Sequence, residues 1–226
     1  MKLFSLLCAI LLFPFMGSTQ RKMQPIVTVD SKLGRQDMTA GRAYIFQGDT
    51  LQCSALKLYL GGIAFLKSGE VVAQWPLDYF LVDFSDESSI SFPLPEVPFT
   101  DFDEVSFNIG VDSLLQVDGP HGGALDPANG MYWTWQNGYI YVKVEGTSSH
   151  ISTSTNAFAW HLGGYQGANK AAQRCTFPCK RHKVQLSVDW SELFRLIRES
   201  NDSHIMSPSV SAVRAMEAIK TGLSAR

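Results

Sequence analysis

The sequence LQCSALKLYLGGIAFL at residues 51–66 has the strongest β-strand pattern in the first half of the chain. Leu56, Leu58 and Leu60 alternate with more polar residues, so the three leucines would share one face of an extended strand. The glycine pair at residues 61–62 predicts a β-bulge, after which the apolar strand resumes. This segment therefore predicts a long strand with one face in the core.

Shorter runs of β-strand character lie on both sides of this segment, at residues 26–29, 44–46, 71–75, 79–84, 89–94, 104–110, 157–162 and 183–188. No long helical pattern separates them. Strands at this spacing predict an all-β fold arranged as an antiparallel β-sandwich.

The pattern becomes helical only near the C-terminus. Asp189 is followed three residues later by Glu192, which is typical of a capping box, and apolar residues then recur at helical spacing. A second helix is predicted to start at residues 207–208, Ser-Pro, and to end at Gly222. The sandwich is therefore expected to carry one or two short C-terminal helices.

A long central loop is predicted at residues 111–131, which are rich in glycine and proline and show no periodicity. Loops of this length in compact domains are usually functional or disordered. Disorder is disfavoured here because the loop leads directly into an aromatic strand, predicted at residues 132–145.

The loop contains a run of turn-forming residues, of which Asp126, Asn129 and Gly130 are expected to shape it. Side chains of the Asp and Asn type hold turns by hydrogen bonds to nearby backbone groups. Asp112, at the end of the preceding strand, is expected to fix the same loop. A calcium site would need more oxygen ligands than this run offers.

The composition describes an ordinary folded protein. The chain has 226 residues, of which 45% are hydrophobic and 18% charged, with a formal net charge of -2. The charge pattern shows no basic cluster, which argues against a nucleic-acid partner. Gly-x-Ser-x-Gly, His-Glu-x-x-His and phosphate-loop motifs are missing from the sequence, so the chain is not expected to be an autonomous enzyme.

The N-terminus has the features of a secretory signal peptide. Lys2 precedes an apolar stretch at residues 3–16 that is too short to span a membrane, and small residues follow it. We expect residues 1–19 to be removed, a single domain over residues 24–224 with no transmembrane segment, and a periplasmic or extracellular location.

Removal of the signal peptide would leave three cysteines: Cys53, Cys175 and Cys179. An exported protein can form disulfides, and Cys175 and Cys179 are close enough in sequence to close a small loop. Either could instead pair with Cys53. A metal site is less favoured, because zinc sites usually contain two such pairs.

Three segments resemble the MbnP-like family of copper-associated envelope proteins: FNIGVD at residues 107–112, GALDPANGMYWTW with the following residues to Gly146, and FAWHLGG at residues 158–164. The resemblance covers about residues 26–223. It implies an Ig-like β-sandwich and a partner related to di-haem cytochrome c peroxidases. It also implies one copper ion held by two histidines and by an oxidised tryptophan, kynurenine.

The resemblance also names candidate site residues. Trp133 or Trp135 matches the oxidised tryptophan, and Trp135 stands where copper-binding members have a histidine if Trp133 is the modified residue. His161 is the best match for a ligand, and His204 is the second. Together with the signal peptide, the resemblance therefore implies an exported copper-associated binding protein.

Two alternatives remain from the residues themselves. The two tryptophans are two residues apart on the predicted strand, so they could share one face and cap the core, and His161 could be a buried core histidine. The chain would then be a structural or ligand-binding module of the envelope without a metal.

Overall fold

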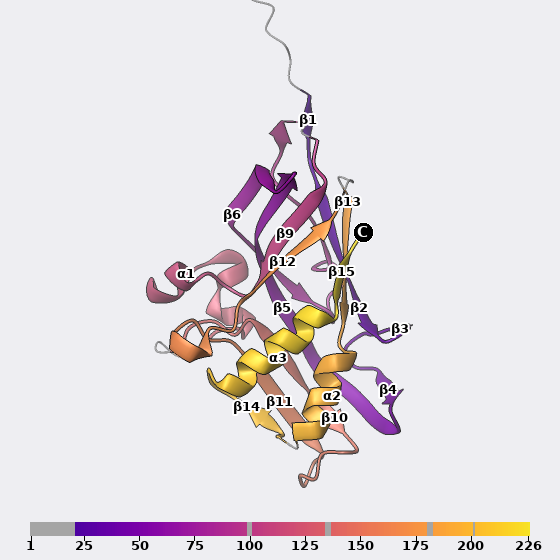
Figure 1. Ribbon diagram of the computed structural model, residues 1–226. Helices are drawn as coiled ribbons and strands as arrows, with labels where there is room; N and C mark the ends of the chain where they lie inside the picture. Colours follow the sequence, from indigo (N-terminus) through magenta and orange to yellow (C-terminus); the bar gives the residue numbers. More distant parts are fainter. Residues whose placement is uncertain (1–20, 99–100, 134–136, 180–182, 201) are drawn as a thin grey trace, which may run out of the picture.

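The larger of two principal sheets is built around one long strand, β5, with neighbours on both of its edges (Figure 1). The computed structural model describes residues 21–98, 101–133, 137–179, 183–200 and 202–226. Within them, the larger sheet consists of β4 (Ala43–Phe46), β5 (Asp49–Lys67), β6 (Glu70–Asp83), β9 (Glu104–Ile109), β10 (Val142–Ser148), β11 (Ala157–Leu162), β12 (Gln173–Pro178) and β14 (His204–Ile205). Leu58 of β5 pairs with both Val142 of β10 and Val82 of β6, so β10 and β6 lie on opposite edges of β5.

The expected alternation and bulge in β5 are confirmed. Leu56, Leu58 and Leu60 are buried in the core. The pairing of β5 with β6 shifts register between Gly61 and Ile63, as a β-bulge does. A side chain at Gly61 would collide with the Tyr79 ring, whose Cε1 lies 2.3 Å from the position of an added Cβ.

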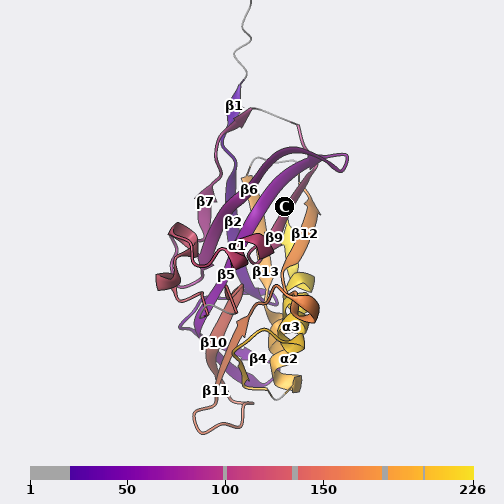
Figure 2. The ribbon, with the colours of Figure 1, turned by 90° about the vertical axis from the view of Figure 1, so that its left-hand side faces the viewer.

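The second sheet packs beside the upper half of the first, as the turned view shows (Figure 2). In the described residues it contains β2 (Ile26–Leu33), β3 (Gln36–Asp37), β7 (Ser91–Pro93), β13 (Lys183–Asp189) and β15 (Leu223–Ala225), and a separate pair is formed by β1 (Lys22–Met23) and β8 (Val97–Pro98). The all-β fold with two sheets is confirmed.

The expected antiparallel order holds for most pairings but not for two of them. β13 runs parallel to β2, and β14 runs parallel to β11. In each of these two pairs, a long stretch of chain with other elements separates the two strands. Such crossover connections allow strands to run parallel, whereas a tight hairpin joins only antiparallel strands.

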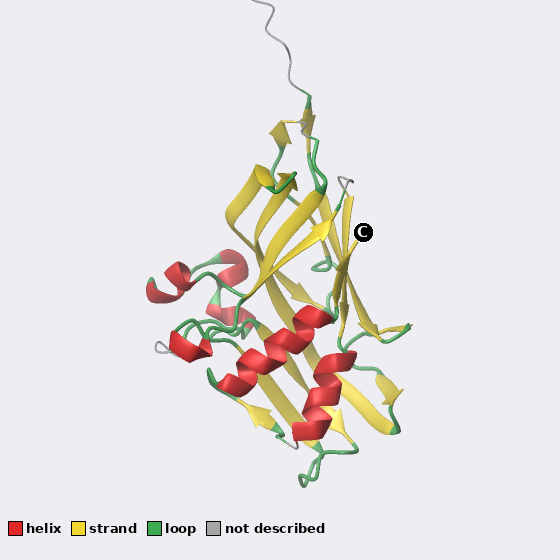
Figure 3. Cartoon of the chain, viewed as in Figure 1, coloured by secondary structure: helices red, strands yellow, loops and turns green. Residues whose placement is uncertain are grey.

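Two C-terminal helices continue the layer of the second sheet over the lower half of the larger one (Figure 3). They are α2 (Ser191–Ser200) and α3 (Val210–Thr221). Asp189 caps α2, because its Oδ1 accepts a hydrogen bond from the Ser191 amide at 2.9 Å. The Glu192 carboxylate pairs with Arg195 rather than completing a capping box. No helix in the described part of the chain is long and apolar enough to cross a membrane.

The central loop covers the opposite face of the larger sheet. It contains one short helix, α1 (Ser113–Val117), and two 3-10 turns, η1 (Gly123–Leu125) and η2 (Pro127–Asn129). Beneath it, Tyr59 of β5 and Tyr141, the residue before β10, are fully buried. The loop therefore forms a third layer over this face.

The predicted strand at residues 132–145 is wrong for the described residues before Val142, and residues 134–136 lie outside the described part of the chain. Tyr132 pairs with Tyr139 in a short antiparallel bridge, and the Trp133 amide donates to the Gly138 carbonyl at 2.9 Å. Gly138 has a φ of 70°, in the left-handed region that favours glycine, where the chain turns back. Trp133 therefore lies opposite Gly138 beside this short bridge, and β10 begins only at Val142.

Candidate functional site

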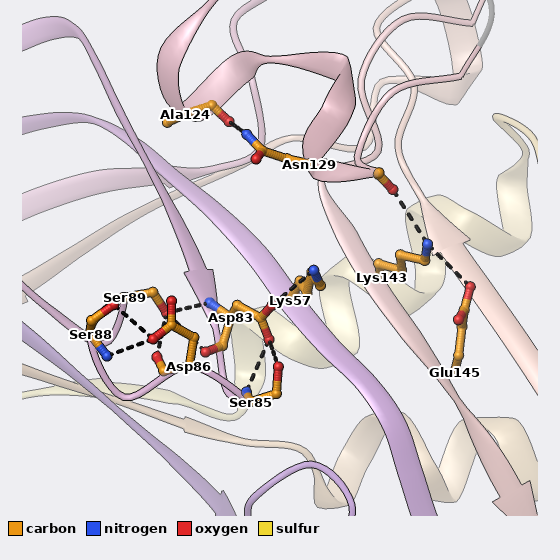
Figure 4. A network of polar contacts seen from close by, with 11 residues as sticks. Lys57, Asp83, Ser85, Asp86, Ser88, Ser89, Ala124, Asn129, Lys143 and Glu145 are labelled. Atoms are coloured by element: carbon orange, nitrogen blue, oxygen red, sulfur yellow. Dashed lines mark hydrogen bonds and ion pairs between the residues drawn. The ribbon is translucent and has the colours of Figure 1, made fainter.

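A row of charged side chains crosses the larger sheet on the face that the central loop covers. Asp83 of β6 is opposite Lys57 of β5, Lys57 is opposite Lys143 of β10, and Lys143 is opposite His161 of β11. Lys57 Nζ lies 2.8 Å from Asp83 Oδ2. The close-up shows both lysines and their carboxylate partners on this face (Figure 4). Because residues directly opposite one another in a sheet share a face, the row places His161 beside the loop.

His161 is held by a carboxylate from the neighbouring strand. Its side chain is only 9% exposed, and its Nε2 lies 2.6 Å from Glu145 Oε1. Lys143 Nζ lies 3.3 Å from the same oxygen. Burial raises the pKa of Glu145, but the hydrogen bond with His161 and the charge of Lys143 outweigh it and lower that pKa below its ordinary value. Since an ionised carboxylate only accepts hydrogen bonds, the Nε2 of His161 carries a proton, and in the neutral ring Nδ1 keeps its lone pair.

Trp133 packs against the backbone just beyond β11. An added Cβ on Gly163, two residues after His161, would lie 2.9 Å from Trp133 Cζ3 and 2.6 Å from the Tyr139 carbonyl oxygen. Only a glycine leaves room for the indole here. In the described part of the chain, the buried Trp133 Nε1 has no hydrogen-bond partner. A buried N–H without a partner costs about 1–3 kcal/mol of stability, so an acceptor that bound Trp133 Nε1 would remove this cost. Trp135 lies outside the described residues.

His204 reaches the same face from β14. It is exposed and pairs with Ala159 of β11. Ala159 in turn pairs with Glu145 of β10, across the opposite edge of β11. His161 is two residues along β11 from Ala159, so the two histidines are diagonal neighbours on one face of the sheet. His204 Nδ1 lies 2.8 Å from Ser203 Oγ. Among the described residues, no group of three His, Cys, Asp or Glu side chains converges as a metal site.

The expected loop-shaping residues make local hydrogen bonds. The carboxylates of Asp112 and Asp126 each accept from the backbone N–H two residues later, at 2.9 and 2.8 Å. Asn129 Nδ2 donates to the carbonyls of residues 123 and 124, at 3.1 and 3.0 Å. Gly130 has a φ of 69°, and its carbonyl accepts from Lys143 Nζ at 3.4 Å. The loop is thereby attached to the charged row (Figure 4).

Comparison with known proteins places the chain in a family. The family model described as MbnP matches residues 23–209. The chain belongs to the MbnP family. Its structure is similar to that of MbnP from Methylosinus trichosporium, with a TM-score of 0.60 and 16% sequence identity over 77% of this chain and 78% of that one. At this identity the similarity supports the fold alone. The search of curated proteins gave no match.

In this MbnP-family chain, Gln116 of α1 holds the short bridge beside Trp133, and sequence reasoning did not identify it. Gln116 is 4% exposed. Its Oε1 accepts from the Tyr139 amide at 2.7 Å, and its Nε2 donates to the Tyr141 hydroxyl at 3.1 Å and to the Val111 carbonyl at 3.3 Å. These contacts join residues distant in sequence, and the motif SLLQV gives no sign of them.

The predicted disulfide between Cys175 and Cys179 is not formed in this MbnP-family chain. Cys53, Cys175 and Cys179 are all buried, and in the described residues none of them is joined by a disulfide. Cys175 lies in β12, and the ladder continues to Cys179, whose amide donates to the Asp103 carbonyl at 2.8 Å. Four residues of extended strand span about 13 Å, whereas a disulfide needs Cα atoms within about 7 Å.

Proposed function

We propose that this chain is an exported copper-associated binding protein in which His161 supplies an imidazole ligand and Trp133 is an oxidisable side chain beside it. Membership of the MbnP family supports the copper association. The observation that carries the assignment is the packing of Trp133 on Gly163, two residues from the buried His161. A periplasmic or extracellular location and a di-haem peroxidase-like partner belong to the same proposal.

The donor set fits copper in its chemistry. Imidazole nitrogens suit copper, and the bond between Glu145 and His161 Nε2 is the outer contact that orients ligating histidines. His204 is the second donor, because the register of β14 puts it on the same face. The buried indole N–H of Trp133 lacks an acceptor in the described residues, which is consistent with a ligand or an altered ring at this position. Bound copper would supply a redox-active centre. Within the chain, Glu145 orients His161, Lys143 neutralises that carboxylate, and Gly163 leaves room for the indole.

Copper loading of the purified protein without its signal peptide tests this proposal. We expect about one copper per chain after removal of excess metal, and a clear loss in His161→Ala and in His204→Ala. His150→Ala is the matched control, because His150 is exposed and lies in the turn at the far end of β10. Copper below about a tenth of an equivalent, or unchanged binding in His161→Ala, would refute the assignment.

A metal-free binding module is the second candidate, and one observation favours it. The ammonium of Lys143 contacts the same Glu145 oxygen as His161, so the carboxylate is already charge-balanced without a metal. This candidate predicts unmodified tryptophan at position 133 in protein isolated from its native cell. Peptide mass spectrometry distinguishes the two candidates, since a mass increase from added oxygen on Trp133 would exclude the metal-free module.

A further inference from the structure

A groove runs along the outer edge of β6, at the opposite end of the charged row from His161. It consists of two cavities of about 520 and 560 Å³. Both are lined by Tyr79, Phe80 and Ala124, so they lie next to each other along the strand. Its far wall is the η1 turn of the central loop, together with residues 93–95 at the end of β7 and just beyond it. Ligand sites in proteins commonly have volumes of about 300–1,000 Å³.

The groove follows the hydrogen-bonding edge of a strand. Consecutive β6 residues 77–81 line the groove. Side chains of consecutive strand residues point to opposite faces of a sheet, so a groove that contacts all of them runs along the edge of the strand. In the structure as described, β6 pairs with β5 alone, and the backbone of residues 77–82 makes no bond to any other element. An open edge of this kind is a template for an added strand. Pro76, which has no N–H, limits the usable edge at one end.

The walls of the groove define the chemistry of its occupant. One end is apolar, with Leu94, Leu125 and the 76% exposed Leu77. Asp78 also lines this end, and Asp83 and Asp86 line the other. Among the described lining residues the one cation is Lys57, so three carboxylates and one ammonium leave a net charge of -2. Lys57 pairs with Asp83, and Asp86 Oδ1 accepts from the Ser88 amide and hydroxyl at 2.9 and 2.7 Å. The charges of Asp78 and Asp86 are therefore not balanced by a lining cation in the described residues. Figure 4 shows Asp86 beside this pair.

We propose that this groove binds an extended peptide segment of a partner protein, which adds to β6 as a strand and carries alternating apolar and basic side chains. The free backbone groups of residues 77–82 supply the main-chain hydrogen bonds, as in other cases of strand addition. The apolar end accepts the uncharged side chains, and Asp78 and Asp86 attract the basic ones. This site is separate from the proposed copper site and does not depend on metal.

Fluorescence anisotropy with the whole mature chain tests the proposal. The probe is a fluorescein-labelled peptide, Val-Lys-Val-Lys-Val-Lys, blocked at its C-terminus. Two comparison peptides isolate the causes of binding: one has glutamate for lysine, and the other is N-methylated at alternate residues on the edge that would face β6. We expect saturable binding of the basic peptide, at least about tenfold weaker binding of each comparison peptide, and amide NMR shifts centred on residues 77–83.

Variants of the chain complete the test. Asp86→Lys is expected to weaken binding of the basic peptide about tenfold. Glu217→Lys makes the same charge change at an exposed position of α3 and is expected to leave this binding unchanged. Ala124→Trp would fill the groove and abolish binding; if it fails to fold, Asp86→Lys still decides. Equal binding of the N-methylated peptide would refute strand addition, because attraction by charge alone would then account for it. NMR shifts away from β6, or no binding of the basic peptide at millimolar concentration, would also refute the proposal.

Discussion

Replacing Gln116 by leucine is expected to destabilise the protein by about 3 kcal/mol. Leucine keeps nearly the same volume but cannot accept from the Tyr139 amide or donate to the Val111 carbonyl. Both backbone groups would then be unpaired in a region where Gln116 itself is only 4% exposed. An unsatisfied buried polar group costs about 1–3 kcal/mol, and two such groups, partly relaxed, give this estimate.

Urea unfolding followed by tryptophan fluorescence measures the effect of Gln116→Leu. The matched control is Leu114→Ala on the same helix, where the side chain is 74% exposed and a change below about 0.5 kcal/mol is expected. Amide hydrogen exchange at Tyr139 should accelerate in Gln116→Leu only. If Gln116→Leu unfolds within about 0.5 kcal/mol of the unaltered protein, the three hydrogen bonds do not hold the short bridge beside Trp133.

Two further predictions follow from the sheet and from the packing of Trp133. Burial raises the pKa of Asp83, but hydrogen bonds from Lys57 and Ser85 lower that pKa by more. The pKa of Asp83 therefore lies below the ordinary value of 3.8. The ionised Asp83 therefore adds stability above its unfolded pKa that is lost as the pH falls through the folded pKa. Urea titrations from about pH 5 to pH 2 should show a smaller loss in Asp83→Asn, and equal slopes would contradict this sign. Gly163→Ala should cost about 1–3 kcal/mol and change the near-ultraviolet circular dichroism of tryptophan, because the added Cβ displaces Trp133; an unchanged spectrum would show that the indole is not packed there.

The sequence predicted features that depend on neighbouring residues. The alternation around Leu58 gave the core face of β5, and the glycine pair gave its bulge. Asp189 marked the start of α2. Each of these signals lies within a few residues of the feature that it predicts, so a single sequence contains it in full.

The features that sequence reasoning got wrong or did not identify depend on distant contacts. Tyr132, Trp133 and Tyr139 have the composition of a strand, but Tyr132 instead pairs with Tyr139, whose amide Gln116 holds. The short spacing of Cys175 and Cys179 suggested a disulfide, yet pairing with β9 extends that segment and separates the two thiols. The open edge of β6 could not be predicted, because strand patterns do not show which strand ends a sheet.

The position of His161 follows from the packing of the opposite face of β11. Phe158 contacts Phe194 of α2, with ring centroids 6.3 Å apart, and Trp160 is fully buried. Since side chains alternate along a strand, these two residues commit Ala159 and His161 to the face beneath the central loop. A shift of one residue would place His161 against the helices and expose both aromatic rings. The apolar core thus fixes the register that brings His161, Glu145 and Lys143 together, so core substitutions at Trp160 should disturb the site without touching any of its polar groups.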